Sequence, residues 1–193
     1  MYLSVHFSVM AEKQSSEMTD RHVIRAARQG DAEALDAISA ETGLSEADDL
    51  NGFGELLAGS LDGSLEGHVW IALEAPDGAV IGGAYYAPEP FSDRVWNLYF
   101  IAVLPAFQGA GLGGLLISHV EATVRELGEQ AARILLVETS SLDRFTLTRQ
   151  FYRNHGYDEE ARIREFYGPG DDKVVFWKSL YASSGQNGAR VTA

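Results

Sequence analysis

Several features that proteins commonly carry are missing from this sequence of 193 residues. It has no cysteine, which excludes a disulfide scaffold, a thiolate zinc or iron–sulfur site and any cysteine nucleophile. This absence fits a reducing compartment, and we expect a cytoplasmic location. No apolar run approaches the roughly 20 residues that a membrane-spanning helix needs, so we expect no membrane partner.

Positive charge is also scarce. The chain has 15 Lys and Arg against 28 Asp and Glu, which gives a net charge of −13. Because nucleic-acid binding needs a basic surface, we expect no nucleic-acid partner. Between Arg28 and Arg94 there is neither Lys nor Arg, whereas acidic residues occur throughout. This stretch is either a solvated acidic face or a source of negative potential that attracts a cationic small molecule or a basic peptide.

The length and composition are those of one folded domain, with 46% hydrophobic and 22% charged residues. We expect this domain over residues 21–181, between a flexible N-terminal arm at 1–20 and a flexible C-terminal tail at 182–193. The first residues lack the basic leader of a signal peptide. The sequence leaves open whether translation starts at Met1, Met10 or Met18.

Hydrophobic periodicity and turn residues predict the order of strands and helices. Asp31 is expected to cap the first helix, and Pro76-Asp77-Gly78 predicts a hairpin turn. The order predicts a mixed α/β (α+β) fold, in which a mostly antiparallel sheet of about seven strands contains one parallel β-α-β crossover and about four helices accompany it. Strands are expected at 22–28, 68–75, 79–86, 95–104, 133–139, 161–167 and 173–180, and helices from 31, around 50–57, and at 112–127 and 145–155.

A glycine-rich segment, 108–114 (QGAGLGG), lies between a buried strand and an amphipathic helix. Glycines let the backbone approach a ligand closely and adopt positive φ. The helix that follows offers unpaired N–H groups and the positive end of its dipole. Together these features predict a site for a diphosphate. No Lys or Arg lies in the segment, so the backbone must do most of the binding.

Two classes of ligand fit such a loop. Gly109, Gly111 and Gly114 match the dinucleotide pattern G-x-G-x-x-G, and Glu138 ends the next strand, where a ribose-binding acid is expected. Against this interpretation, residues 105–108 separate the glycines from the strand. Only 55 residues follow Glu138, too few for the further β-α units of a dinucleotide-binding sheet.

The second class is acyl-CoA. Residues 101–105 (IAVLP) followed by Gln108-x-x-Gly111-x-Gly113 resemble the acyl-CoA signature of the GNAT superfamily of N-acyltransferases, Q/R-x-x-G-x-G/A. Further along, residues 151–157 (FYRNHGY) resemble that superfamily's second motif, F-Y-x-x-x-G-F. The resemblance extends over about residues 23–180 and includes the order of the elements.

The resemblance implies a GNAT-like fold, acetyl-CoA as the co-substrate and no metal. It implies that strand residues Ile101, Ala102 and Val103 hold the pantetheine arm, mainly through the main chain of the first and third. It places Tyr152 near the thioester sulfur. The sequence departs from the family at Ala110, where a basic residue is frequent. The implied diphosphate cradle is Gln108, Gly109, Ala110, Gly111, Leu112, Gly113 and Gly114.

Without cysteine, no acetyl-cysteine intermediate can form, so the simplest route is direct attack of an amine on the bound thioester. That route needs a general base for the amine and an acid for the departing thiolate. Tyr152 is the candidate acid, and Glu138 is the candidate base. The alternatives for the base are Glu89, Asp93, and a water held by Asn97, Tyr99 or Ser140.

These observations predict an N-acetyltransferase that transfers the acetyl group of acetyl-CoA to a primary amine. In the family, the first two helices usually shape the acceptor side, and here they fall in the cation-free stretch. We therefore expect a cationic small-molecule or peptide acceptor, and a monomer or homodimer. The alternatives are a non-catalytic acyl-CoA sensor and a NAD(P)-dependent oxidoreductase.

Overall fold

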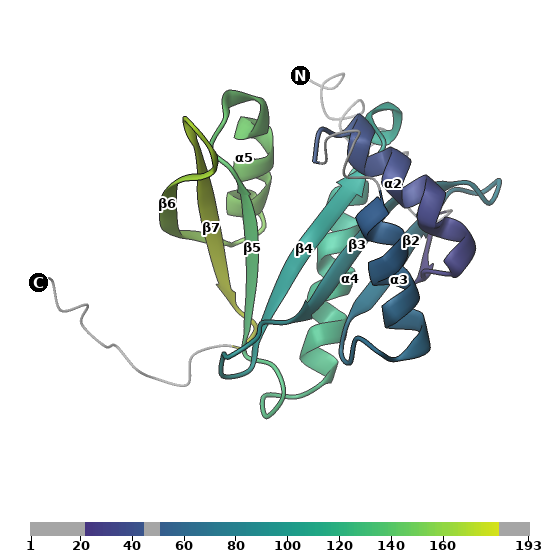
Figure 1. The fold of residues 1–193 in the computed structure, drawn as a ribbon, viewed down its shortest axis with the longest axis horizontal. Helices are drawn as coiled ribbons and strands as arrows, with labels where there is room; N and C mark the ends of the chain where they lie inside the picture. Colours follow the sequence, from purple (N-terminus) through teal and green to yellow (C-terminus); the bar gives the residue numbers. More distant parts are fainter. Residues whose placement is uncertain (1–21, 45–50, 182–193) are drawn as a thin grey trace, which may run out of the picture. The chain divides into compact units, whose positions relative to one another are not determined.

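A computed structural model describes residues 22–44 and 51–181 of the chain (Figure 1). The predicted arm at 1–20 and tail at 182–193 lie outside the described residues. The chain divides into two compact units. The first comprises Met1–Pro88 and Asn97–Ala122, and the second comprises Glu89–Trp96 and Thr123–Ala193.

The first unit is built on strands that follow one another in the order β1-β2-β3-β4. β1 pairs antiparallel with β2 from Val23 opposite Glu74, and β2 pairs antiparallel with β3 from Val69 opposite Tyr86. The predicted hairpin turn is present, since Ala79 N donates to the Asp77 carboxylate at 3.0 Å. The bounds are β1 (Val23–Ala26), β2 (Val69–Glu74), β3 (Val80–Pro88) and β4 (Val95–Val103).

Helices α2 (Ala32–Glu41) and α3 (Asn51–Asp62) cover one face of these strands, and α4 (Leu112–Glu126) covers the other (Figure 1). The core beneath α2 and α3 is aromatic. Trp70 stacks on Tyr85 with ring centroids 4.5 Å apart, and Phe53 of α3 packs edge-on against Trp70 and Phe100. Leu35, Ile38 and Leu57 complete this core from the two helices, which explains their apolar spacing.

Asp31 does not cap α2 as predicted. The helix does begin beside it, after a single 3₁₀ turn at Gln29–Asp31, but its side chain makes no cap hydrogen bond. Its carboxylate instead accepts from Arg25 Nη1 at 2.6 Å, from Arg25 Nη2 at 3.0 Å and from Arg28 N at 2.7 Å. The hydrogen bonds from Arg25 therefore hold the pKa of Asp31 below its usual value. The carboxylate thus pairs with Arg25, six residues earlier on β1, and with the backbone at the start of the 3₁₀ turn instead of capping α2.

We expect Asp31→Asn to lower the free energy of unfolding by about 2 kcal/mol at pH 7, because it removes a charged partner of the mostly buried Arg25 guanidinium. Since the folded-state pKa lies below the unfolded one, the carboxylate stabilises the fold above about pH 4 and loses this effect as the pH falls. The difference from the parent protein in urea unfolding should therefore shrink in acid. Asp36→Asn is the control, because burial raises the pKa of Asp36 and its charge stabilises nothing. Equal losses in both variants would contradict the prediction.

In the second unit, β7 lies between β5 and β6, and both pairs are antiparallel. Ser140 of β5 stands opposite Lys173 of β7, and Val137 stands opposite Phe176. Val174 and Phe176 are fully buried. The bounds are β5 (Ile134–Ser140), α5 (Thr146–Asn154), β6 (Asp158–Gly168) and β7 (Asp171–Ser179).

The predicted fold class is confirmed. The chain has a mixed, mostly antiparallel seven-stranded sheet with one parallel pair, and four α-helices lie within the described residues. The main differences concern β6 and β7, which begin a few residues earlier than the sequence predicts. Within 22–44 and 51–181, no helix is long and apolar enough to cross a membrane.

Candidate active site

The glycine-rich loop has the backbone geometry that its sequence predicts. It follows the short 3₁₀ helix Pro105–Phe107 and leads directly into α4. Gly109 has a φ of +78° and Gly111 a φ of +82°, a region that residues with a side chain rarely adopt. A Cβ built at either position meets no atom within 4 Å. The space in front of the two glycines is therefore open to a ligand.

The first amides of α4 precede its hydrogen-bond ladder. Leu115 N donates to Gly111 O at 3.0 Å, so the ladder begins at Leu115. The N–H groups of Leu112, Gly113 and Gly114 thus belong to the helix end that has no intrahelical acceptors. With the dipole of a 15-residue helix behind them, they suit an anion.

The side chain of Gln108, the first residue of the predicted cradle, is hydrogen-bonded to the strand before the loop. Its Nε2 donates to Val103 O at 2.8 Å, which ties the loop to the end of β4. Just before the loop, Leu104 N donates to Ile81 O of β3 at 2.8 Å. These bonds fix where the loop leaves the strand.

The three β4 residues assigned to the pantetheine arm differ in where their side chains lie. Ala102 belongs to the core beneath α2 and α3, so only its main chain is available to a ligand. Ile101 is half-buried and Val103 is buried. A cavity of about 500 Å³ adjoins the loop. It is lined by His22, Pro76, Ala106, Phe107, Gln108, Ala110 and Leu112.

Tyr152, the predicted acid, lies on α5 in the second unit. Only 3% of it is exposed, and its ring packs on Phe176 and Tyr157 with centroids 5.4 and 6.0 Å away. Burial, with a smaller contribution from Tyr167, raises the pKa of Tyr152 well above the ordinary tyrosine value. The phenol therefore keeps its proton through the neutral range and is available as a hydrogen-bond donor.

Glu138, the predicted base, is already paired. Its Oε2 lies 2.7 Å from Lys173 Nζ. Glu138 stands opposite Val175 in the β5–β7 register, whereas Val137 stands opposite Phe176, which contacts Tyr152. Because neighbouring residues of a strand point to opposite faces, Glu138 and Tyr152 lie on opposite faces of this unit's sheet.

The alternatives for the base are also engaged. Asp93 pairs with Arg94 at 2.7 Å and with Arg133 at 3.3 Å, and the Arg94 bond holds the pKa of Asp93 below its usual value. Ser140 Oγ donates to Asp171 at 2.6 Å. Asn97 is buried, while Tyr99 remains 47% exposed.

The comparisons with known proteins agree with this geometry. A family model described as the acetyltransferase (GNAT) domain matches residues 66–159. A structure from Desulfovibrio desulfuricans assigned to the GNAT family is 30% identical, with 83% of this chain and 99% of that one covered and a TM-score of 0.74. The chain belongs to the GNAT acetyltransferases. No curated protein matches the sequence significantly.

Two more distant GNAT-fold structures show how far the fold is shared. Salmonella typhimurium yncA, solved with acetyl-CoA, is 20% identical, with coverage of 86% and 98% and a TM-score of 0.68. A chimera of the Vibrio cholerae spermidine N-acetyltransferase SpeG with hSSAT is 16% identical, with coverage of 83% and 96% and the same TM-score.

This GNAT protein is an acyltransferase that uses acetyl-CoA as its co-substrate, and its loop fits that molecule's diphosphate. The two open glycines and the first α4 amides have the geometry that an anion requires. Bound acetyl-CoA would supply an activated thioester. In the described part of the chain, no three His, Asp or Glu side chains are grouped to hold a metal ion.

The candidate residues fall into two sets. The loop and the β4 residues belong to the first unit, and Tyr152 and Glu138 belong to the second. The sequence interpretation missed Lys173 and Tyr167 as neighbours of Glu138, and Phe166 as a neighbour of Lys173. Only the turn 168–172 between β6 and β7 gave a signal in that region, because it predicts that the two strands pair.

Proposed function

We propose that this GNAT acetyltransferase acetylates a primary amine of a cationic small molecule or peptide by direct attack within a ternary complex. The observation that carries the proposal is the open glycine loop at the start of α4. Its amides suit a diphosphate although the loop carries no cationic side chain. We assign the catalytic domain to residues 21–181.

Charge supports a cationic acceptor. α2 and α3 carry only acidic charges, and Glu33, Glu41 and Glu55 are exposed on them. Negative potential over such a surface raises the local concentration of a cation and speeds its encounter with the protein. The spermidine N-acetyltransferase among the structural neighbours acts on a cationic acceptor of this kind.

In the proposed mechanism, residues 101–103 of β4 hold the pantetheine arm and residues 108–114 hold the diphosphate. The amine forms its bond to the acyl carbon as the carbon–sulfur bond breaks. Tyr152 donates a hydrogen bond to the departing sulfur. Glu138, on the face of β5 opposite Tyr152, is the proposed acceptor of the amine's proton. This role requires the amine to reach the thioester from that face and the ion pair with Lys173 to open.

Release of free thiol from acetyl-CoA across a panel of amines tests the proposal. We expect release with polyamines and lysine-like amines, and slower turnover at high salt because salt screens the acidic surface. Uncharged amines of similar length are the control. A preference for neutral or anionic amines would contradict the proposal that the acceptor is cationic. Binding of acetyl-CoA without release for any amine would favour a sensor.

A further inference from the structure

The ammonium of Lys173 occupies a site of the kind that binds ammonium ligands. Its Nζ lies 2.7 Å from Glu138 Oε2 and 3.6 Å from the centroid of the Phe166 ring. The Lys173 side chain is only 13% exposed, and that of Glu138 is 28% exposed. A carboxylate and an aromatic face around one cation form a combination that proteins use to recognise alkylammonium groups.

Strand register brings two of these residues together. Lys173 stands opposite Ser140, two residues beyond Glu138 on β5. Residues two apart on a strand point to the same face, so Glu138 and Lys173 are diagonal neighbours on one face of the sheet. That face is opposite the one that packs against Tyr152.

A bulge in β6 contains Phe166, whose ring lies against the Lys173 ammonium. Ile163 stands opposite Lys173 and Gly168 opposite Asp171, so residues 164–167 of β6 face the single residue 172 of β7. Glu165, within the bulge, has a φ of +51°, which a residue with a side chain rarely adopts. Such backbone strain persists only where surrounding contacts enforce it.

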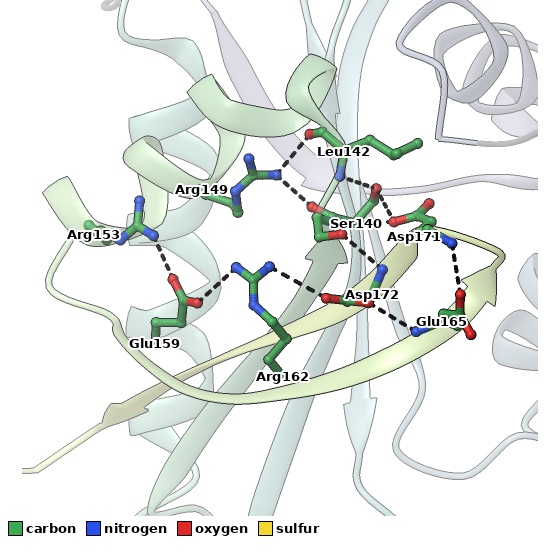
Figure 2. A network of polar contacts seen from close by, with 11 residues as sticks. Ser140, Leu142, Arg149, Arg153, Glu159, Arg162, Glu165, Asp171 and Asp172 are labelled. Carbon is green, nitrogen blue, oxygen red and sulfur yellow. Dashed lines mark hydrogen bonds and ion pairs between the residues drawn. The ribbon is translucent and has the colours of Figure 1, made fainter.

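A polar network enforces this conformation (Figure 2). Glu165 N donates to Asp172 Oδ1 at 3.0 Å, and Gly170 N donates to Glu165 Oε1 at 3.3 Å. Asp171 fixes the end of β5 by accepting from Ser140 Oγ and from Ser141 N. The carboxylate and the ring around the Lys173 ammonium therefore stand on strands whose geometry is fixed by other residues.

Tyr167 lies at the edge of this group. It is 48% exposed, and burial together with the negative charges of Glu138 and Asp171 raises its pKa to about 12. The surroundings of Glu138 thus favour a positive charge and disfavour a further negative one.

We propose that Glu138 and Phe166 form an ammonium-binding site for the acceptor, and that Lys173 is an internal competitor which the acceptor's ammonium displaces. Lys173 would then determine specificity, because only acceptors that bind better than the chain's own ammonium can enter. The identification of the ligand as the acceptor rests on the proposed function. The existence of the ammonium-binding site itself does not depend on the proposed function.

Lys173→Met tests this directly, since it removes the ammonium and keeps an unbranched apolar side chain. We expect it to bind spermidine at least 10-fold more tightly than the parent chain, measured by calorimetry on the full chain without acetyl-CoA. The gain should disappear in Lys173→Met/Phe166→Leu and in Lys173→Met/Glu138→Gln. Lys173→Arg keeps a competing cation and should show no gain. An unchanged or weaker spermidine affinity in a Lys173→Met variant with a normal melting transition would overturn the proposal.

A second measurement uses the parent chain, so it does not depend on the folding of any variant. Saturating spermidine should expose the Lys173 amine and increase its reductive methylation several-fold relative to Lys178, the internal reference. The labelling is read by mass spectrometry, with formaldehyde and hydride in excess over the amines of spermidine, which consume them. Unchanged labelling would overturn the proposal. If spermidine binding behaves as expected but no amine releases thiol from acetyl-CoA, the acetyltransfer proposal fails and the ammonium site stands.

Discussion

Gly111→Asp is expected to weaken acetyl-CoA binding at least 100-fold while the protein remains folded. The new carboxylate would lie at the mouth of the amide cradle and repel a doubly charged diphosphate. It would also accept the same α4 N–H groups that the diphosphate needs, and hydrogen bonds to charged groups are worth about 1.5–3 kcal/mol each. The fold should tolerate the change because a Cβ at this position meets nothing within 4 Å.

The backbone adds a smaller cost, since Gly111 has a φ of +82°. Asp and Asn both tolerate this left-handed region better than most residues, at about 1–2 kcal/mol. Gly111→Asn is therefore the matched control, with the same shape and strain but no charge. Calorimetric titration with acetyl-CoA should find the Asp variant at least 10-fold weaker than the Asn variant. Equal affinities would mean that the diphosphate binds elsewhere.

The sequence predicted the elements whose patterns are long and locally determined. The apolar run at 95–104 became β4, and the apolar stripe that starts at Leu112 became α4. The glycine loop was predictable for the same reason, because positive φ and a helix start are properties of a few consecutive residues. Each of these predictions depended on the chain's local pattern rather than on distant contacts.

Features that depend on which side chains the folded chain brings together could not be predicted. Asp31 is a residue type that often caps helices, but its carboxylate forms an ion pair with Arg25, six residues earlier on β1. The Glu138–Lys173 pair joins residues on two strands whose register no local pattern specifies. The β6 bulge is harder still, since it places a non-glycine residue, Glu165, at positive φ.

Gln108 shows a third kind of limit. The motif identified the position correctly as part of the loop, but residue type alone does not say where a side chain points. The structure shows its amide bonded to Val103 O. The residue that begins the signature thus holds the loop against β4 through its side chain.

Tyr152→Phe is expected to lower the turnover number about 100-fold with little change in acetyl-CoA affinity. A 100-fold loss corresponds to about 2.7 kcal/mol of transition-state stabilisation, which is a reasonable cost for losing one positioned donor to the departing sulfur. Phenylalanine keeps the ring contacts with Phe176 and Tyr157, so the fold should be unaffected. Tyr157→Phe is the control, because it removes a hydroxyl from the same buried cluster but from a residue with no assigned role. Equal turnover in the Tyr152 variant and the parent would remove Tyr152 from the mechanism.

The raised pKa of Tyr152 also determines the form of the pH profile. Full proton transfer from a phenol of pKa above 10 to a thiolate whose acid has a pKa near 8.5 is uphill by more than about 2 kcal/mol, so Tyr152 acts as a hydrogen-bond donor that keeps its proton. The protonated phenol is the active form, and it is lost only as the pH rises through the raised pKa. Turnover should therefore rise with pH as the amine loses its proton and should not fall again below pH 10. A decline in turnover with an apparent pKa between 8 and 9 that is absent from Tyr152→Phe would contradict this. It would show that the phenol ionises below the ordinary tyrosine pKa and that burial does not raise its pKa.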